Sequence, residues 1–325
     1  MRVLVTGAGG FVGSAVADRL AGAGLAVTAL HRREPAGGVP AGAGSPGVVT
    51  VVADLLDRER IHRIVEAGRF EAVCHLAGLT NGRESLERPL SYFDVNLGGT
   101  IGLLQALEAA PPSGGWVRFV FASTHGVYGS PDLGRPINED DATLPINPYG
   151  VSKLAAEQAL AFQAATGRLG AVSLRCFNVA GAAGASADRD RSRIIPMALA
   201  VASGEADAFP LNGDGSAIRE FVHVADVADA FLLALRTARR GEHVALNIGS
   251  GDGISMRDLL TAIETRTGRT LRVSARPPKP EARIVLADTG RARRTLGWAP
   301  ARSTLDRVIG DAWAAVQAGD GGRIG

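Results

Sequence analysis

Residues 6–13 read Thr-Gly-Ala-Gly-Gly-Phe-Val-Gly, and this stretch decides the fold. It lies between a short apolar run and an alanine- and leucine-rich stretch. Three of its glycines permit a tight turn, close approach of the backbone to a pyrophosphate, and close packing of a helix on a strand. The start of that helix offers free N–H groups and a positive dipole end to the phosphates. Although the chain has 42 glycines, this position makes the trio a strong signal. We therefore predict a dinucleotide-binding turn whose contacts are made by Gly7, Gly10, Phe11, Val12 and Gly13.

Further along the chain, short apolar runs alternate with longer helical stretches. Near-continuously apolar strands are typical of a parallel sheet covered on both faces. The predicted strands are Val3–Thr6, Ala26–Leu30, Val48–Val52, Ala72–Leu76, Arg118–Ala122 and Ala171–Arg175. The predicted helices are Gly13–Ala23, Arg58–Ala67, Ser91–Ala110 and Tyr149–Thr166. This alternation predicts an α/β fold with a doubly wound, mostly parallel sheet of the Rossmann type.

After about residue 176 the rhythm breaks, which predicts a smaller C-terminal α/β substrate domain. Arg219–Val224 and Ala245–Ile248 are expected to return to the sheet region. We assign residues 1–175 and 218–250 to the dinucleotide-binding domain, and 176–217 and 251–318 to a second domain. The latter should contain helices at Ile194–Ser203, Ser255–Thr267 and Thr304–Ala318 and a strand at Leu271–Ser274. The segment 34–47 is predicted to be a mobile loop, and 319–325 a frayed tail.

The residues after the second strand bear on the choice of nicotinamide dinucleotide. An acidic residue there binds the ribose 2′-hydroxyl of NAD, whereas an arginine suits the 2′-phosphate of NADP. Here His31 is followed by Arg32 and Arg33, which favours NADP. The alternative is NAD, with His31 bonded to the ribose and the arginines solvated. Beyond the third strand, Asp54 and Leu55 are candidates for adenine contact; Asp54 could instead be a helix N-cap.

Tyr149 and Lys153 form the candidate reactive pair. The chain has three tyrosines and only two lysines, yet one of each lies at i and i+4, where side chains share a helix face. An ammonium favours the phenolate and so lowers the phenol pKa, toward the range in which a proton-transfer catalyst works best. The alternative is a helix-surface pair without chemistry.

Composition excludes several classes of protein. The net charge is +2, and no long basic stripe predicts nucleic-acid or anionic-membrane binding. Cys74 and Cys176 lie in apolar runs, as expected of free thiols in a reducing compartment. Met1 leads directly into a strand, and no apolar run reaches the length of a membrane span. We expect a soluble, cytoplasmic protein, and we identify no metal site.

Several motifs occur together in one order. They are the glycine turn, His75-Leu76-Ala77-Gly78, Asn96, Ala122-Ser123-Thr124, the Tyr149–Lys153 pair, Leu174–Gly181, Arg219–Asp226, Leu246–Gly251, Ala287-Asp288 and Leu296-Gly297-Trp298. This set resembles the extended short-chain dehydrogenase/reductase superfamily. Within it, the chain is most similar to NAD-dependent epimerases and dehydratases of nucleotide sugars, especially the UDP-glucose 4-epimerase family.

The resemblance implies a catalytic set. Tyr149 would be the acid/base group at the sugar 4-position, and Lys153 would hold the nicotinamide ribose. Thr124 would bond the reacting oxygen, with Ser123 as its substitute. Leu76, Ala77, Gly78 and Asn96 would line the cofactor. Thr80 stands where the family often has a lysine that touches the cofactor, and we place it on the substrate side.

The resemblance also implies a diphosphate clamp. Asn178 and Arg219 would grip the nucleotide diphosphate, since a guanidinium suits phosphate oxygens. Arg276 is our choice for the second arginine, with Arg283 competing. Val285 occupies a place where the family can carry a tyrosine, so we expect a pocket that admits an N-acetylated or otherwise modified sugar.

Three functions are consistent with this pattern. We favour a nucleotide-diphosphate-sugar 4-epimerase that oxidises and reduces C4 with a retained cofactor. The alternative is an NADPH-dependent reductase of a nucleotide-linked 4-keto-deoxyhexose, and a minor one is a non-catalytic dinucleotide-binding regulator. A 4,6-dehydratase is disfavoured because His125 and Gly126, rather than an acidic pair, follow Thr124. Family members commonly form homodimers through two long helices, here Ser91–Ala110 and Tyr149–Thr166.

Overall fold

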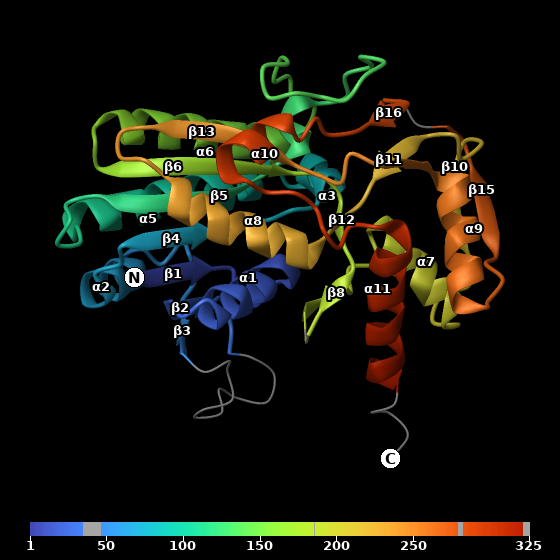
Figure 1. Ribbon diagram of the computed structural model, residues 1–325, viewed down its shortest axis with the longest axis horizontal. Helices are drawn as coiled ribbons and strands as arrows, with labels where there is room; N and C mark the ends of the chain where they lie inside the picture. The colour runs from blue at the N-terminus through green and yellow to red at the C-terminus, as the bar shows by residue number, and fades with distance from the viewer. Residues whose placement is uncertain (35–46, 185, 279–281, 321–325) are drawn as a thin grey trace.

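The computed structural model describes residues 1–34, 47–184, 186–278 and 282–320 (Figure 1). Most of the predicted mobile loop and of the predicted tail lies outside these residues.

A seven-stranded sheet forms the centre of the molecule (Figure 1). Its strand order is β13-β6-β5-β4-β1-β2-β3, and every neighbouring pair is parallel. The strands are β1 (Arg2–Thr6), β2 (Ala26–His31), β3 (Val48–Val52), β4 (Ala72–His75), β5 (Val117–Thr124), β6 (Leu169–Cys176) and β13 (His243–Ile248). The chain winds outward from β1 in both directions, so the carboxyl ends of β1 and β4 border the crevice where such sheets bind ligands. The predicted doubly wound fold is confirmed.

Helices cover both faces of this sheet. One face packs on α1 and α8, and the other on α2, α5 and α6, each over its own buried apolar core. The bounds are α1 (Phe11–Gly22), α2 (Arg58–Gly68), α5 (Gly99–Ala109), α6 (Pro148–Ala165) and α8 (Val224–Thr237). Helix α8 was not among the predicted helices.

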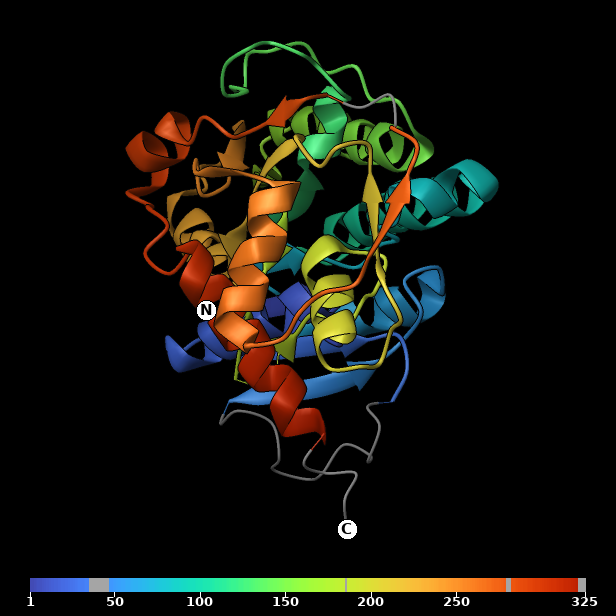
Figure 2. The same ribbon diagram turned by 90° about the vertical axis from the view of Figure 1, so that its right-hand side faces the viewer.

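A second group of elements lies beyond the carboxyl edge of the sheet, at the right of Figure 1 and facing the viewer in Figure 2. Its core joins α7 (Ile194–Ala202), α9 (Met256–Thr267) and α11 (Leu305–Asp320), and we call it the α7–α9–α11 cluster. Short strands surround it: β7 (Val179–Ala180), β8 (Ala182–Ala183), β9 (Ser186–Ala187), β10 (Phe209–Asn212), β11 (Ile218–Glu220), β12 (Val222–His223), β14 (Gly253–Ser255), β15 (Val273–Arg276) and β16 (Ile284–Val285). A last short helix is α10 (Gly290–Leu296).

The expected return of 219–224 to the sheet is wrong. Strand β11 pairs with β14 and β16, and β12 pairs with β7, so neither joins the central sheet. Only the later run returns, as β13 beside β6. Two- and three-residue strands carry too little apolar alternation for their partners to be predicted. The proposed domain boundaries stay a prediction.

The predicted helix Ser91–Ala110 is interrupted. After α3 (Gly82–Glu87), the chain forms α4 (Pro89–Tyr92), a π-helical segment η1 (Phe93–Gly98) and then α5. Such π-helical turns are frequent at functional sites. Asn96 lies within η1, so the irregular turn presents one of the predicted site residues.

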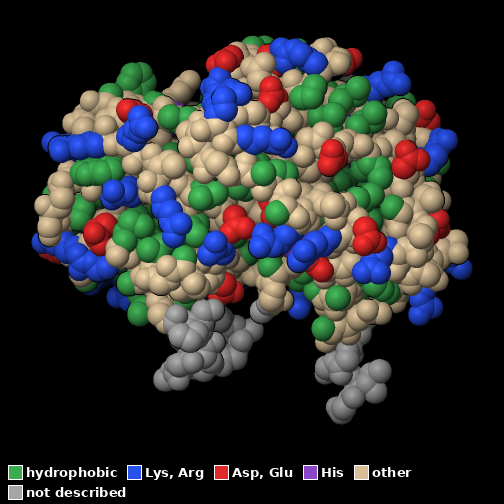
Figure 3. All heavy atoms as spheres, viewed as in Figure 1, with side chains coloured by type: hydrophobic (Ala, Val, Ile, Leu, Met, Phe, Trp, Pro, Cys, Tyr) green, Lys and Arg blue, Asp and Glu red, His purple; other side chains and the backbone are tan. Residues whose placement is uncertain are grey.

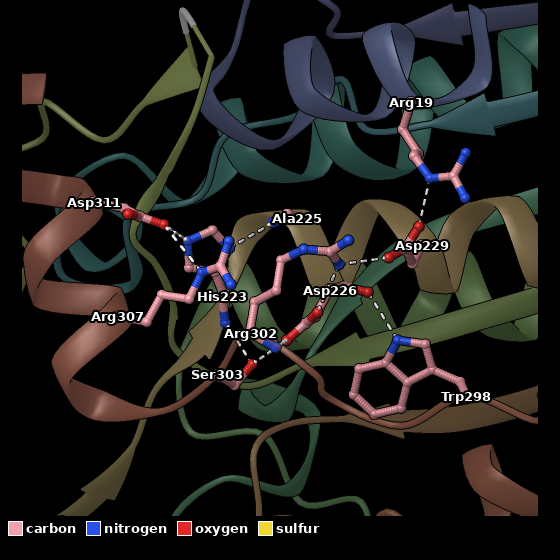
Figure 4. Close-up of polar contacts among 10 residues, drawn as sticks. All are labelled: Arg19, His223, Ala225, Asp226, Asp229, Trp298, Arg302, Ser303, Arg307 and Asp311. Carbon is pink, nitrogen blue, oxygen red and sulfur yellow. Dashed lines mark hydrogen bonds and ion pairs between the residues drawn. The ribbon is translucent and has the colours of Figure 1, made fainter. Parts of the chain in front are cut away.

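The His-Val-Ala-Asp stretch at the start of α8 has a structural role (Figure 4). Asp226 is 1% exposed, and its carboxylate accepts hydrogen bonds from the Arg302 backbone nitrogen and the Ser303 hydroxyl, both at 2.7 Å. The Trp298 indole donates to its backbone carbonyl at 2.8 Å. A buried carboxylate needs such partners. This cluster fastens segment 298–303 to α8 and so helps to hold α11 in place.

The surface mixes acidic and basic side chains, as Figure 3 shows for one face. Among the described helices, none is long and apolar enough to cross a membrane.

Candidate functional site

The glycine turn between β1 and α1 has the shape of an anion cradle. A Cβ on Gly7 would lie 2.6 Å from the Ala77 nitrogen, and one on Gly13 would lie 2.1 Å from the Gly7 oxygen. Gly10 is the N-cap of α1, no side chain caps this end, and its first turn contains no acidic residue. The first N–H groups of the helix therefore face a space suited to phosphate. The cradle fits the dinucleotide that the sequence predicts.

His31 lies over this turn. Its Nδ1 would be 3.0 Å from a Cβ on Gly9, and partial burial lowers the pKa of the imidazole. A neutral ring at this position can exchange hydrogen bonds with a ribose, whereas Arg32 beside it is exposed.

The residues after β3 show which aspartate caps the following helix. Asp54 is exposed, and its Oδ1 accepts from the Leu56 nitrogen at 2.9 Å. The N-cap of α2 is Asp57, which accepts from the Arg60 nitrogen. The suggestion that Asp54 caps the helix is therefore wrong, and the adenine contact stays a prediction. Leu55 is buried against the sheet face under α5.

A buried histidine fixes the loop after β4. Thr100 donates to the Asn96 carbonyl at 2.6 Å, so its oxygen must accept from His75 Nε2, 3.0 Å away. His75 Nδ1 then accepts from the Thr6 hydroxyl at 2.7 Å. That hydroxyl oxygen accepts in turn from the Ala77 nitrogen at 3.1 Å. Burial, with a smaller effect from the Lys153 charge, lowers the pKa of His75 to about 3. The neutral imidazole thus locks the predicted cofactor loop to β1.

Asn96 holds the next part of the same loop. Its Oδ1 accepts from the Leu79 nitrogen at 2.8 Å, and its Nδ2 donates to the Leu79 carbonyl and the Ser152 hydroxyl at 3.0 Å. A Cβ on Gly78 would lie 2.7 Å from Asn96 Oδ1. The amide thus positions the loop against α6, while its direct contact with the cofactor stays a prediction.

Tyr149 lies on the first turn of α6. Its phenol interacts with the side chain of Thr124, whose Oγ1 accepts from the Gly126 nitrogen at 3.1 Å. Its ring meets the buried Tyr92 edge to face, with centroids 6.3 Å apart. Burial raises the pKa of Tyr149, and the Thr124 hydrogen bond and the Arg193 charge oppose that rise. The predicted lowering of the phenol pKa by Lys153 is wrong for this arrangement, because desolvation dominates.

Lys153 lies one turn along α6 and is 2% exposed. Its Nζ donates to the Ala122 carbonyl at 3.0 Å and lies 4.7 Å from the centre of the Phe121 ring. Burial lowers its pKa to about 8. An ammonium has three donors, and a Cβ on Gly78 would lie only 3.3 Å from it. The ammonium therefore faces the cofactor loop, as expected of a group that holds a ribose.

Ser123 does not share this site. Its hydroxyl donates to Glu157, which is 3% exposed and binds the Arg175 guanidinium through both oxygens. Arg175 also donates to the Tyr128 hydroxyl at 2.9 Å. Because successive strand residues point to opposite faces, Ser123 cannot substitute for Thr124. The assignment of Ser123 as a catalytic residue is wrong.

The predicted diphosphate clamp is partly assembled. Asn178 donates to the Glu220 carbonyl at 3.0 Å. The nearby Arg219 is nearly buried, and its Nη1 donates to the Ile218 carbonyl at 2.8 Å. Burial lowers the pKa of His125, and the Arg219 charge adds a smaller effect in the same direction. Arg276 lies on the exposed strand β15, paired with β10.

Val285 packs in a buried apolar cluster with Phe177, on the strand beside Arg219. The ligand roles of Asn178, Arg219, Arg276 and Val285 stay predictions.

Two site residues were not predicted. The Cys176 thiol lies close enough for charge interaction with both Tyr149 and Lys153, and burial raises its pKa to about 12. Its place follows from the register, since it pairs with Thr124. Arg193 reaches Thr80 Oγ1 at 3.4 Å and acts on the Tyr149 phenol. Its only sequence signal is a run of alternating charges before α7.

Known proteins resemble the chain over its full length. The model of the NAD dependent epimerase/dehydratase family matches residues 3–249. A UDP-glucose 4-epimerase of Streptomyces lividans is 39% identical over 324 residues, covering 96% of this chain and 95% of that protein.

Two solved structures extend the likeness to the fold. A UDP-glucose-4-epimerase from Stenotrophomonas maltophila with bound NAD and formylated UDP-arabinopyranose matches with a TM-score of 0.89 and 34% identity, over 99% of each chain. A UDP-glucose 4-epimerase from Bifidobacterium longum in complex with NAD+ and UDP matches with a TM-score of 0.88 and 27% identity, over 99% of this chain and 100% of that one.

Proposed function

The chain belongs to the NAD-dependent epimerase/dehydratase family, and from that premise we propose that it is a nucleotide-diphosphate-sugar 4-epimerase with a retained NAD. The observation that carries the proposal is the grouping of Tyr149, the buried Thr124 and the buried Lys153 at the sheet edge that also holds the glycine cradle. The relative and the two solved structures named above are UDP-glucose 4-epimerases.

The residues present can perform the proton transfers that this reaction needs. The base is the Tyr149 phenolate, whose formation the Thr124 side chain and the Arg193 charge favour against burial. The phenolate takes the proton of the sugar 4-hydroxyl and later returns it, and Thr124 bonds the same oxygen while the charge on that oxygen changes. A bound nicotinamide would supply a reversible acceptor for the hydride that leaves C4 of the sugar. Lys153 and the glycine cradle orient the dinucleotide, so the protein contributes position and proton transfer.

Support for NAD comes from the second strand and from the relatives. Both solved structures named above hold NAD or NAD+. The uncharged imidazole of His31 lies beside the turn and can bond a ribose diol without a phosphate. NADP, which Arg32 and Arg33 favour in the sequence, is the competing outcome.

The test uses purified protein with UDP-glucose and no added dinucleotide. Formation of UDP-galactose, together with NAD released on denaturation and identified by mass, supports the proposal. Protein that retains no dinucleotide and consumes NADPH with a 4-keto sugar would establish the reductase instead.

We also propose that two copies pair through α5 and α6. Two apolar side chains on the outer face of α6 are exposed in the single chain: Val151 at 38% and Phe162 at 79%. Pairing would bury them and form a four-helix interface. Sedimentation that gave a monomer at micromolar concentration would contradict this.

A further inference from the structure

One cationic side chain approaches the proposed catalytic phenol from the α7–α9–α11 cluster. Arg193 is the N-cap residue of α7, with extended backbone at φ −96° and ψ 154°. Its Nη2 lies 3.4 Å from the Thr80 hydroxyl oxygen, on the loop that follows β4. Its charge lowers the pKa of Tyr149, against the larger effect of burial. The guanidinium therefore lies between the loop after β4 and the α7–α9–α11 cluster.

Two carboxylates hold this guanidinium at its other edges. Asp188, whose side chain is 6% exposed, pairs with Nη1 at 3.1 Å. Asp190, whose side chain is 44% exposed, pairs with Nε at 3.5 Å. The described contacts leave Nη2 with only a long bond to a neutral hydroxyl. The two acids thus leave one guanidinium nitrogen, Nη2, beside the Thr80 hydroxyl, while the guanidinium charge acts on the Tyr149 phenol.

The chemistry of the sugar limits what this nitrogen can meet. If Tyr149 serves the oxygen on C4, the nearest other substituents are those on C3 and C5. C3 of a nucleotide hexose carries a hydroxyl, whereas C5 carries C6, which is either a hydroxymethyl group or a carboxylate. A neutral amide would satisfy a hydroxyl. A planar, permanently charged fork is matched to a carboxylate.

We propose that Arg193 binds the C6 carboxylate of a nucleotide-diphosphate hexuronic acid, so that uronates are the preferred substrates of this site. The proposal rests on the 4-epimerase function given above and names its substrate class. The substrate carboxylate displaces Asp190 from the guanidinium, because the pair of Asp190 with Arg193 is long and exposed. Such pairs contribute little to stability. The Asp190 carboxylate keeps the Ser192 nitrogen as a donor at 2.9 Å. A substrate carboxylate shielded from water interacts more strongly with the same charge.

The test compares two substrates on the full-length protein. Initial rates are measured with UDP-glucuronic acid and with UDP-glucose, and the readout is the ratio of their kcat/KM values. We expect wild type to favour the uronate and Arg193→Gln to lower the ratio about tenfold to hundredfold, the size of a charge-assisted hydrogen bond. Any loss through the phenol affects both substrates and cancels in the ratio.

The matched control is Arg191→Gln, two residues earlier. Arg191 pairs with Glu205 instead of facing Thr80, so its loss should leave the ratio within about twofold, as expected for an exposed pair. Asp190→Asn removes the competing carboxylate and should raise the ratio about twofold to fivefold.

The outcomes separate this proposal from the function on which it rests. Epimerisation of UDP-glucose with no turnover of UDP-glucuronic acid would overturn the uronate proposal and leave the epimerase intact. So would an equal loss on both substrates in Arg193→Gln, which a purely structural arginine would give. Failure to epimerise either sugar would overturn the proposed function itself.

Discussion

The glycine cradle and the Arg193 corner are two walls of one candidate site, and they are built in opposite ways. The cradle spans eight consecutive residues between β1 and α1, and β1 is aligned on both sides by parallel ladders of four and five residue pairs. The Arg193 corner depends on a loop and on strands of two or three residues. Long ladders fix position along the chain, whereas short strands leave it to individual side chains.

The two walls also differ in tolerance. The cradle has no room for a Cβ at Gly7 or Gly13, and the substitution there would meet backbone atoms. The Arg193 corner is held by ion pairs that are partly exposed. We infer that the cofactor wall is rigid and that the sugar wall is where specificity can change at small cost in stability.

The largest effect that we expect is on the cofactor wall. Tyr149→Phe removes the proton carrier and should lower kcat about a thousandfold, the usual scale of acid–base catalysis. Tyr92→Phe is the matched control, because that buried ring packs edge to face on Tyr149 but its hydroxyl donates to Glu84. Its kcat should stay within about threefold of wild type. Equal losses in the two variants would mean that packing, and not the phenol, is being measured.

The next effect concerns a buried carboxylate at the end of β11, beside the predicted diphosphate clamp. Glu220 is fully buried and accepts from the backbone nitrogens of Gly251 and Ala287. Burial raises its pKa to about 7, against the opposing effect of these hydrogen bonds. Between pH 4.5, the ordinary pKa of a glutamate, and pH 7, Glu220 is protonated in the folded state but ionised in the unfolded state. Its contribution to stability is therefore present at low pH and lost as pH rises toward 7.

Urea unfolding at several pH values measures this. From pH 4.5 to 7 the loss should be about 3 kcal/mol, and Glu220→Gln should abolish that slope. Glu59→Gln, at an exposed residue of α2, should retain it. A slope unchanged by Glu220→Gln would show that Glu220 is not the titrating group.

The rigidity of the cradle is tested within one helix. The Cβ introduced by Gly13→Ala would lie 2.1 Å from the Gly7 oxygen, whereas one at Gly22 would meet nothing within 4 Å. Gly13→Ala should lower the unfolding free energy by about 1–3 kcal/mol, as overpacking does, and reduce the retained dinucleotide. Gly22→Ala should be neutral or stabilising by up to about 1 kcal/mol. Similar behaviour of the two would contradict a tight cradle.

The smallest effect is expected at an exposed arginine of the sugar wall. Arg276 lies on the exposed strand β15, and Arg276→Ala should change KM by less than about threefold, as for an exposed charge. Arg219→Ala, at the nearly buried arginine, should raise KM at least about tenfold. A tenfold effect at Arg276 would instead support its predicted role as the second half of the clamp.

The sequence predicted the cofactor wall because its signals are local. The spacing of the glycines and of Tyr149 and Lys153 lies within one turn or one helix, and the doubly wound, mostly parallel sheet follows from the alternation of strands and helices. Its error there was energetic: proximity of Lys153 to Tyr149 suggested a lower pKa, but burial outweighs charge.

The sugar wall could not be predicted in the same way. Outside that wall, the partner of Ser123 was equally hidden, because the buried Glu157–Arg175 pair joins side chains from two different elements. The place of Arg193 depends on Asp188 and on where α7 begins. Such contacts join separate segments without a fixed spacing, so no local pattern reveals them.

The most direct test of the account follows the hydrogen at C4. UDP-glucose carrying deuterium at C4 is converted by purified protein in the absence of added dinucleotide, and the product is examined by mass and NMR. We predict UDP-galactose that keeps its deuterium at C4, since the hydride leaves and returns within one site. Deuterium replaced by hydrogen at C4 would contradict this prediction.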